Sequence, residues 1–309
     1  MPGEPDVLIV GGGVAALTAA TVAARLGLAA TVVCDILVGG QILNVETVTN
    51  YPGLPEPISG GDLAAHVEEQ ARDAGAEFVF GEAQSIRPGG RGYVVESSEG
   101  AFTAPAAIVA TGSRLRRLGV AGEDRLAGSG VSYCGSCDGP LFAGRRVLVA
   151  GGGDSAADEA LVVAEHASEV IVVTREAELS AAAATVERLR GHPRIQVRPR
   201  SEPTEILGEA AVSGVRLADL QTGEQLTVEV EGVFVFVGLE PNTEILSGTA
   251  ELDPAGYVRT DQWMATSAAG LFAAGDLRRD SPRQLVNAAS DGATAAIAAH
   301  RHLSHTRPR

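Results

Sequence analysis

Two cysteines separated by two residues carry the clearest chemistry in this sequence. Cys134 and Cys137 lie in the segment Cys134-Gly135-Ser136-Cys137-Asp138. Thiols at this spacing close a small reversible disulfide, and the lowered thiolate pKa typical of such motifs makes one sulfur a competent nucleophile. Asp138 directly follows the pair, where it is placed to exchange protons with a leaving thiolate and also to cap a helix. The pair therefore predicts thiol–disulfide chemistry.

Half of a zinc site is the alternative interpretation of the same spacing, and zinc needs two further Cys or His ligands. The third cysteine, Cys34, lies far upstream at the end of a predicted buried strand, where packing is its expected role. No second cysteine pair exists, and the histidines form no metal-ligand spacing with an acidic or thiol partner. We therefore expect no metal and a redox role for the pair.

A glycine-rich turn near the start predicts a nucleotide site. The apolar run 6–10 is followed by Gly11-x-Gly13-x-x-Ala16 and an Ala-rich segment. In the dinucleotide fingerprint the first glycine makes the turn, the second lets pyrophosphate approach the backbone, and a small third residue lets helix and strand pack. Asp35 ends the next β-rich run, where an acidic side chain accepts hydrogen bonds from ribose hydroxyls. A solvated aspartate in a turn is the other interpretation of Asp35.

The same pattern returns in the middle of the chain. Gly151-Gly152-Gly153 follows the apolar run 146–150 and precedes an Ala-rich helix that contains Ser155 and Ala156. Gly151, Gly153, Ser155 and Ala156 are therefore candidates for a second, nicotinamide-type nucleotide site.

Two strand-turn-helix units of this kind predict an α/β protein with two Rossmann-like dinucleotide-binding domains. No Pro/Gly/Ser-rich linker separates two halves, and an Ala-rich helix is predicted at 291–303, near the end of the chain. This order indicates an inserted domain. We predict that the host domain resumes near residue 242, after the inserted domain.

The composition excludes several classes of function. Among 309 residues, 24 are Lys or Arg and 39 are Asp or Glu, and the formal net charge of -15 repels nucleic acid and anionic lipid. The sequence contains no lysine, which excludes a Walker A loop and lysine Schiff-base chemistry. No apolar run is long enough to span a membrane, and the start lacks the basic segment of a signal peptide. We expect a cytoplasmic protein with no nucleic-acid or membrane partner.

Taken together, the motifs resemble those of the low-molecular-weight thioredoxin reductases, FAD-containing disulfide reductases of the two-domain pyridine-nucleotide type. The resemblance runs nearly end to end and includes both glycine turns and the Cys pair. Its further motifs are Gly39-Gly40-Gln41, Asn50-Tyr51-Pro52-Gly53, Ala110-Thr111-Gly112-Ser113, Gly275-Asp276 and Arg283-Gln284. Val14 and Ala16 stand where the family usually has proline and glycine, and alanine is tolerated at the third position of the fingerprint.

The resemblance implies roles for individual residues. A discontinuous domain, 1–112 and 242–309, would bind FAD, with Asp276 on the ribityl chain. The inserted domain, 113–241, would carry the Cys pair and the second glycine turn. The other flavin-site residues that the resemblance implies are Gly40, Gln41 and Asn50, which line the flavin, Thr111 and Gly112 of the shared motif, and Arg283 and Gln284, which close over the isoalloxazine. Cys137 would face the flavin, and Cys134 would attack the disulfide of a thioredoxin-like protein or small disulfide substrate, with Asp138 as proton donor. The resemblance also implies a homodimer formed through the FAD domains.

One departure from the family concerns the electron donor. The family holds the 2'-phosphate of NADPH with a His-Arg-Arg-x-x-x-Arg run, where cationic groups fork around the phosphate. The matching run here is Thr174-Arg175-Glu176-Ala177-Glu178-Leu179-Ser180, in which only Arg175 remains. A carboxylate beside a phosphate dianion turns attraction into repulsion. NADPH is therefore disfavoured.

Several interpretations of this departure stay open. Glu176 could accept the 2'-hydroxyl of NADH. Reduced ferredoxin or a reduced flavin could instead be the electron donor. The relay could also run in reverse, with the pair oxidising a small dithiol and FAD passing the electrons to oxygen. A non-catalytic flavoprotein that senses redox state is the alternative from another class, although it would not need the Cys pair with Asp138.

Overall fold

The computed structural model describes residues 4–45, 47–90 and 92–306. Residues 1–3 and 307–309, which are the two ends of the predicted discontinuous domain, lie outside the described residues. None of the candidate site residues falls outside the described part of the chain.

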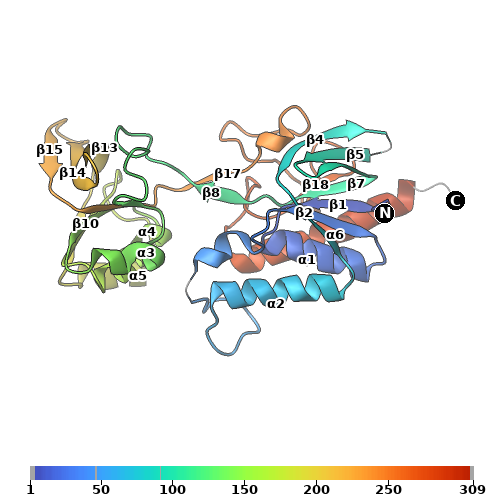
Figure 1. Cartoon of the computed structure of the whole chain (residues 1–309), viewed down its shortest axis with the longest axis horizontal. Coiled ribbons are helices and arrows are strands. Elements are labelled where there is room, and N and C mark those ends of the chain that lie inside the picture. The colour runs from blue at the N-terminus through green and yellow to red at the C-terminus, as the bar shows by residue number, and fades with distance from the viewer. Residues whose placement is uncertain (1–3, 46, 91, 307–309) are drawn as a thin grey trace. The chain divides into compact units, whose positions relative to one another are not determined.

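The chain divides into two compact units (Figure 1). Unit 1 comprises Met1–Arg114 and Glu240–Arg309, and unit 2 comprises Leu115–Leu239. Each unit contains a five-stranded sheet in which every pair of neighbouring strands is parallel. The predicted α/β class with two Rossmann-like folds is therefore confirmed. The assignment of FAD and a nicotinamide nucleotide to particular residue ranges stays a prediction.

The sheet of unit 1 has the strand order β18-β7-β1-β2-β3. Its central strand, β1, is an uninterrupted apolar run in which all four residues are buried, as expected for a strand covered on both faces. The strands are Val7–Val10 (β1), Ala30–Cys34 (β2), Glu77–Phe80 (β3), Ala106–Val109 (β7) and Leu271–Ala273 (β18).

Helices cover one face of this sheet and a β-meander covers the other. Helices α1 (Val14–Arg25) and α6 (Leu285–Thr306) share a core with alternate residues of β1 and β2. Gly292 allows the two helices to approach closely, because a Cβ there would lie 2.1 Å from the carbonyl oxygen of Ala15. Helix α2 (Gly60–Asp73) packs beside α1, and the antiparallel meander consists of β4 (Ala83–Gly89), β5 (Gly92–Ser97) and β6 (Gly100–Ala104).

Unit 2 repeats this plan around the order β12-β11-β10-β16-β9. Its parallel strands are Val131–Ser132 (β9), Arg146–Ala150 (β10), Glu169–Val173 (β11), Ile195–Arg198 (β12) and Gly232–Val235 (β16). Its helices are Gly135–Asp138 (α3), Asp154–Ala164 (α4) and Ala183–Arg190 (α5). Its antiparallel sheet consists of Ser201–Gly208 (β13), Val212–Asp219 (β14) and Gln225–Val228 (β15). This smaller sheet shares a core with β9, β10, β11 and β16.

The chain crosses between the units twice, in strands β8 (Ser113–Leu115) and β17 (Leu239–Pro241), which pair with each other (Figure 1). In the described part of the chain, the remaining elements are three short 3-10 helices at Gly40–Asn44, Gly139–Phe142 and Glu244–Leu246. Among the described residues, no helix is both long enough and apolar enough to cross a membrane.

Candidate active site

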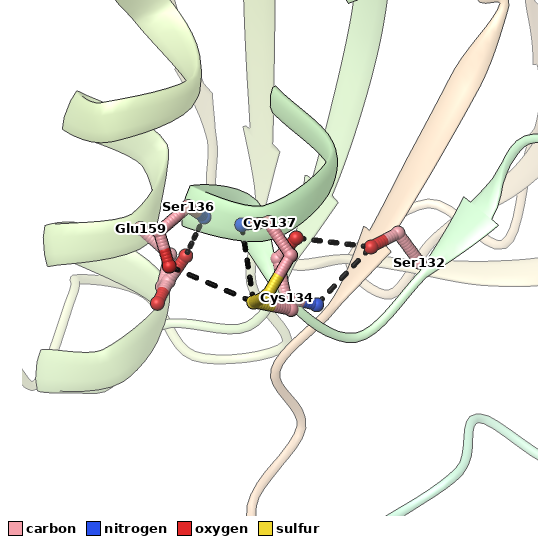
Figure 2. Close-up of a disulfide and its surroundings, with 5 residues drawn as sticks. All are labelled: Ser132, Cys134, Ser136, Cys137 and Glu159. Atoms are coloured by element: carbon pink, nitrogen blue, oxygen red, sulfur yellow. Dashed lines mark hydrogen bonds between the residues drawn. A yellow bond between two sulfur atoms is a disulfide. The ribbon is translucent and has the colours of Figure 1, made fainter. Parts of the chain in front are cut away.

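The two cysteines form a disulfide at the start of α3 in unit 2 (Figure 2). Their Cα atoms are 5.4 Å apart, and the Sγ atom of Cys134 accepts a hydrogen bond of 3.2 Å from the backbone N–H of Cys137. The preceding strand holds Cys134 in place, because Ser132 Oγ accepts from its N–H and donates to its carbonyl oxygen, both at 3.1 Å. The backbone N–H on the Cys134 sulfur would stabilise a thiolate there when the pair is reduced.

Access to the pair differs between the two residues. Cys137 is exposed, whereas Cys134 and Asp138 are partly buried. Asp138 lies at the end of α3, and its backbone N–H donates to the carbonyl oxygen of Cys134. Leu141, four residues after Cys137, leaves 70% of its surface exposed. Cys137 and the apolar side chain of Leu141 are thus both exposed.

The third cysteine is unsuited to this chemistry. Cys34 ends β2 and is buried, and the burial, together with the neighbouring Asp35, raises the pKa of its thiol to about 11. The packing role expected for Cys34 from the sequence agrees with this environment. Among the described residues, no group of three or more His, Cys, Asp or Glu side chains is arranged to hold a metal ion.

The first glycine turn leads into helix α1, whose start has no side-chain cap. Gly11 has a φ of 119°, and a Cβ there would lie 2.3 Å from the carbonyl oxygen of Ala110. Gly13 is the N-cap of α1, and no side chain caps that helix or adds an acidic group to its first turn. Ala16 is buried in the helix–sheet core. An uncapped N-terminus beside a glycine turn suits the pyrophosphate of a dinucleotide, so these residues fit FAD.

Segments distant in sequence converge on this turn. The backbone N–H of Gly39 donates to Gly12 at 2.8 Å, and a Cβ on Gly40 would lie 3.2 Å from the Cα of Gly13. A Cβ on Gly275 would lie 3.1 Å from the Cβ of Ala15. Asp35 is exposed at the end of β2, the strand next to β1. The fold therefore brings the glycine motifs of the N-terminal and C-terminal segments together around the turn that follows β1.

Other predicted flavin-site residues form hydrogen bonds within unit 1. Asn50 Nδ2 donates to Gln284 Oε1 at 3.4 Å, which joins two segments that the resemblance assigns to the flavin. Gln41 Nε2 donates to the carbonyl oxygen of Ser113 at 2.9 Å. Thr111 and Gly112 are held by Asn242, which accepts from Thr111 Oγ1 through its carbonyl oxygen and donates through its N–H to Gly112.

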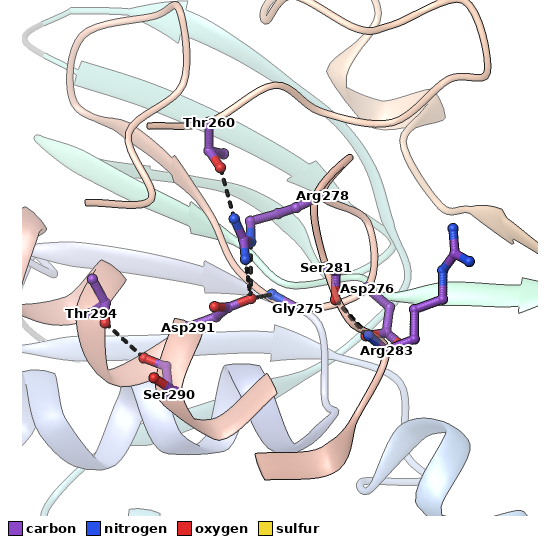
Figure 3. Close-up of polar contacts among 9 residues, drawn as sticks. All are labelled: Thr260, Gly275, Asp276, Arg278, Ser281, Arg283, Ser290, Asp291 and Thr294. Atoms are coloured by element: carbon purple, nitrogen blue, oxygen red, sulfur yellow. Dashed lines mark hydrogen bonds and ion pairs between the residues drawn. The ribbon is translucent and has the colours of Figure 1, made fainter. Parts of the chain in front are cut away.

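The loop after β18 brings two more candidates together (Figure 3). Asp276 accepts a hydrogen bond from Ser281 Oγ at 3.1 Å, and burial raises the pKa of its carboxyl group. Arg283 has a φ of 56°, and its guanidinium donates to Tyr257 Oη at 3.0 Å. A hydroxyl-rich chain beside Asp276 would supply donors to this partly buried carboxylate.

A buried ion pair that sequence reasoning missed supports this loop (Figure 3). Arg278 donates to Asp291 Oδ2 from Nε at 2.9 Å and from Nη2 at 2.8 Å, and Asp291 also accepts from the backbone N–H of Gly275 at 3.1 Å. Both side chains are buried. The sequence feature that could have pointed to this ion pair is Asp291, an aspartate within an Ala-rich helical segment. The pair fixes Gly275 to α6, and it therefore positions the neighbouring Asp276.

The second glycine turn has a similar backbone but a different charge. Gly151 has a φ of 141°, and a Cβ there would lie 2.2 Å from the carbonyl oxygen of Phe236. Gly153 is the N-cap of α4, Ser155 is exposed in its first turn and Ala156 is buried. Unlike α1, this helix begins with an acidic residue, Asp154, whose carboxylate accepts from the N–H of Ala182.

The run that follows β11 lies against this turn. Ser180 donates to the carbonyl oxygen of Gly152 from its N–H at 2.8 Å and from its Oγ at 3.2 Å. Thr174 is 5% exposed, and a Cβ on Gly152 would lie 2.4 Å from its Oγ1. Arg175 is paired with Glu202 at 3.1 Å, and Glu176 is exposed. The single cation of the run thus already has an acidic partner.

Comparisons with known proteins agree with this architecture. Residues 5–292 match the family model described as pyridine nucleotide-disulphide oxidoreductase. A thioredoxin reductase of Treponema pallidum (strain Nichols) is 41% identical over 303 residues, which cover 98% of each chain.

Solved structures give the same result. The thioredoxin reductase of Lactococcus lactis in its FR conformation superposes with a TM-score of 0.94 at 34% identity, covering 98% of this chain and 100% of that chain. The thioredoxin reductase of T. acidophilum superposes with a TM-score of 0.90 at 34% identity, covering 96% of this chain and 98% of that chain.

The family resemblance inferred from the motifs is therefore confirmed, and so is the expectation of an oxidoreductase. The family implies FAD and a nicotinamide nucleotide as cofactors. The individual roles of the site residues stay predictions. With a disulfide in one Rossmann-like unit and a glycine turn at an uncapped helix start in the other, this chain belongs to the pyridine nucleotide-disulphide oxidoreductase family and is an oxidoreductase of the low-molecular-weight thioredoxin reductase type.

Proposed function

We propose that this protein passes electrons from FAD to the Cys134–Cys137 disulfide, and from the resulting dithiol to the disulfide of a thioredoxin-like protein or a small disulfide substrate. The observation that carries the proposal is the disulfide itself, which joins Cys134, the N-cap of α3, to Cys137 within that helix. FAD, when bound, supplies the two-electron exchange with this disulfide.

The chain's own residues account for the transfer to the partner. The reduced Cys134 sulfur, which accepts the N–H of Cys137, attacks one sulfur of the partner disulfide and forms a mixed disulfide. Cys137 then attacks Cys134, which releases the partner as a dithiol and restores the intramolecular disulfide. Asp138, which is adjacent to the pair in sequence and partly buried, would donate a proton to the leaving thiolate.

A protein partner would dock on the surface around the pair. Leu141 is the exposed apolar side chain nearest to the pair in sequence, and exposed apolar groups beside a reactive residue favour a protein partner. Thioredoxin is the partner class that the names of the relatives indicate. A small disulfide would not need this side chain, so the effect of its replacement distinguishes the two substrates.

For the electron donor, we propose that NADPH is disfavoured. Arg175 is paired with Glu202, and Glu176 and Ser180 provide no cation where the family has arginine. NADH is the first alternative, because the exposed Glu176 carboxylate is available to a ribose hydroxyl. Reduced ferredoxin, a reduced flavin and the reverse oxidase direction are the remaining alternatives.

Stopped-flow measurement of flavin reduction tests this proposal. The oxidised holoprotein is mixed anaerobically with NADPH, NADH or reduced ferredoxin, and the loss of flavin absorbance is followed. Bleaching by NADH at rates above those with NADPH supports the Glu176 interpretation. Bleaching by ferredoxin alone would indicate that electrons do not enter through a nucleotide at the second glycine turn. Oxygen uptake with a dithiol, measured separately in the presence of air, would support the oxidase direction. A donor that bleaches the flavin but never reduces the pair would indicate the non-catalytic sensor.

A further inference from the structure

A carboxylate on another helix contacts the segment between Cys134 and Cys137. Glu159 lies on α4, and its Oε2 atom accepts a hydrogen bond of 3.1 Å from the backbone N–H of Ser136, between the two cysteines (Figure 2). The hydroxyl of the same Ser136 lies 3.6 Å from the Cys134 sulfur. The Glu159 carboxylate and the Cys134 sulfur are therefore linked through one residue.

A glycine between the cysteines makes room for this carboxylate. A Cβ on Gly135 would lie 2.3 Å from Glu159 Oε2 and 2.9 Å from a methyl group of Val163. No side chain fits at position 135 while Glu159 keeps its present place. Gly135 has an ordinary helical backbone, so the glycine is required by the close approach of Glu159 and not by backbone strain.

We propose that the Glu159 carboxylate disfavours the thiolate form of Cys134 in the reduced pair and thereby makes the pair a stronger reductant. A negative charge next to a thiol opposes its ionisation, and Glu159 also takes up a backbone N–H that could otherwise face the sulfur. Less stabilisation of the reduced form lowers the reduction potential of a disulfide, as thiol–disulfide couples of different thiolate stability demonstrate. Glu159 acts through Cys134 and is a positioning and tuning residue, not a catalytic one.

The other ionisable groups around the pair do not occupy this position. Asp138 follows the pair, and His166, beyond α4, lies against Gly139. On the strand side, Tyr133 donates to the buried Glu123 at 2.7 Å and accepts from Arg117 at 3.2 Å. Burial raises the pKa of Tyr133, which keeps it neutral. Among these carboxylates, Glu159 is the one that accepts an N–H of a residue between the two cysteines.

The test measures how fast iodoacetamide alkylates Cys134 as a function of pH. The holoprotein is used in a Cys137→Ser background, so that Cys134 is the accessible thiol, because the raised pKa of the buried Cys34 keeps that thiol unreactive. Glu159→Gln keeps the side-chain length and an oxygen acceptor for Ser136, so it removes the charge while it retains the contact. Glu165→Gln is the matched control, since Glu165 is exposed at the end of the same helix.

We expect Glu159→Gln to move the midpoint of the alkylation profile down by about one pH unit and to raise the rate at neutral pH about fivefold. Glu165→Gln should leave the midpoint unchanged. Gly135→Ala should act in the same direction as Glu159→Gln, because the added Cβ displaces the flexible end of Glu159. This second variant keeps the proposal testable if Glu159→Gln does not fold.

A second readout uses the intact pair. Equilibration with dithiothreitol reduces the disulfide to two thiols as dithiothreitol is oxidised, so the electrons balance. At a pH near 8.5, we expect the dithiol form to be favoured about fivefold more in Glu159→Gln than in the parent. Profiles and equilibria equal to those of Glu165→Gln, or shifted in the opposite direction, would overturn the proposal.

This inference rests on the proposed function for its biological meaning, but its two readouts need neither an electron donor nor a partner. An unchanged alkylation profile would leave the proposed reduction of a partner standing. A protein that fails to reduce any disulfide partner would leave the effect of Glu159 on Cys134 measurable.

Discussion

Restoring two cations to the second nucleotide turn should raise the affinity for NADPH. The structure selects Glu176→Arg with Ser180→Arg, because both positions are exposed. Thr174, the third position that differs from the family, is buried and is therefore left unchanged. The double variant reverses one charge and adds another beside the existing Arg175.

The size of the effect follows from the hydrogen bonds that the two new arginines would donate to the 2'-phosphate. A hydrogen bond to a charged group contributes about 1.5 to 3 kcal/mol. Because both positions are exposed and screened by solvent, the lower end of that range applies, which gives about 3 kcal/mol for two such bonds, or roughly a hundredfold in the dissociation constant. The ion pair between Arg175 and Glu202 opposes binding in both proteins and cancels from the comparison.

The assay is the dependence of flavin bleaching on the concentration of NADPH, with NADH in parallel. Glu178→Arg is the control, because Glu178 is exposed on the same run and its replacement changes the net charge without restoring the fork. We expect the double variant to reach half-maximal bleaching at a far lower NADPH concentration than the parent or this control. Rapid bleaching of the unaltered protein at low micromolar NADPH would refute the reasoning, since other residues would then hold the phosphate.

Four further outcomes are expected. Asp276→Asn should weaken flavin retention on dialysis yet raise the melting temperature of the apoprotein. Burial raises the pKa of the Asp276 carboxyl group, so its ionisation costs folding free energy at every pH above that raised pKa. The asparagine amide does not ionise and removes this cost. A lower melting temperature would contradict it. Cys137→Ser should trap a thioredoxin-like partner as a mixed disulfide through Cys134, and trapping by Cys134→Ser instead would reverse the two roles. Leu141→Glu should raise KM severalfold for a protein partner but not for a small disulfide, and equal effects on both would exclude docking at this side chain. Light scattering should give a homodimer at micromolar concentration, and a monomer there would refute the dimer but not the relay.

Local patterns made the two nucleotide folds predictable. Each apolar strand is followed by a glycine whose positive φ and close backbone neighbour leave no room for a side chain, as at Gly11 and Gly151. These requirements lie within a few residues of sequence, so the turn, the strand before it and the helix after it were all expected. The Cys pair is likewise a local feature, and its spacing, together with the lack of a second cysteine pair, favoured a disulfide over a zinc site.

Contacts between distant segments were not predictable. The last helix was expected at 291–303, but α6 begins at Leu285, whose side chain packs beside the core formed by α1 and α2. The ion pair of Arg278 with Asp291 and the contact of Glu159 with Ser136 join separate elements. No periodicity in a single sequence reveals which buried carboxylate meets which donor. The sequence shows a glycine at position 135, but the close approach of Glu159, which explains why a glycine is needed there, is seen only in the fold.

Anaerobic titration of the holoprotein with dithionite tests the central claim most directly, because it counts the electrons that the protein accepts. The account predicts uptake of four electrons per subunit, two by FAD and two by the Cys134–Cys137 disulfide, since the buried free thiol of Cys34 accepts none. The double variant Cys134→Ser with Cys137→Ser should accept two. Uptake of only two electrons by the unaltered protein, with no new thiol at Cys134 or Cys137, would contradict an electron relay through this pair.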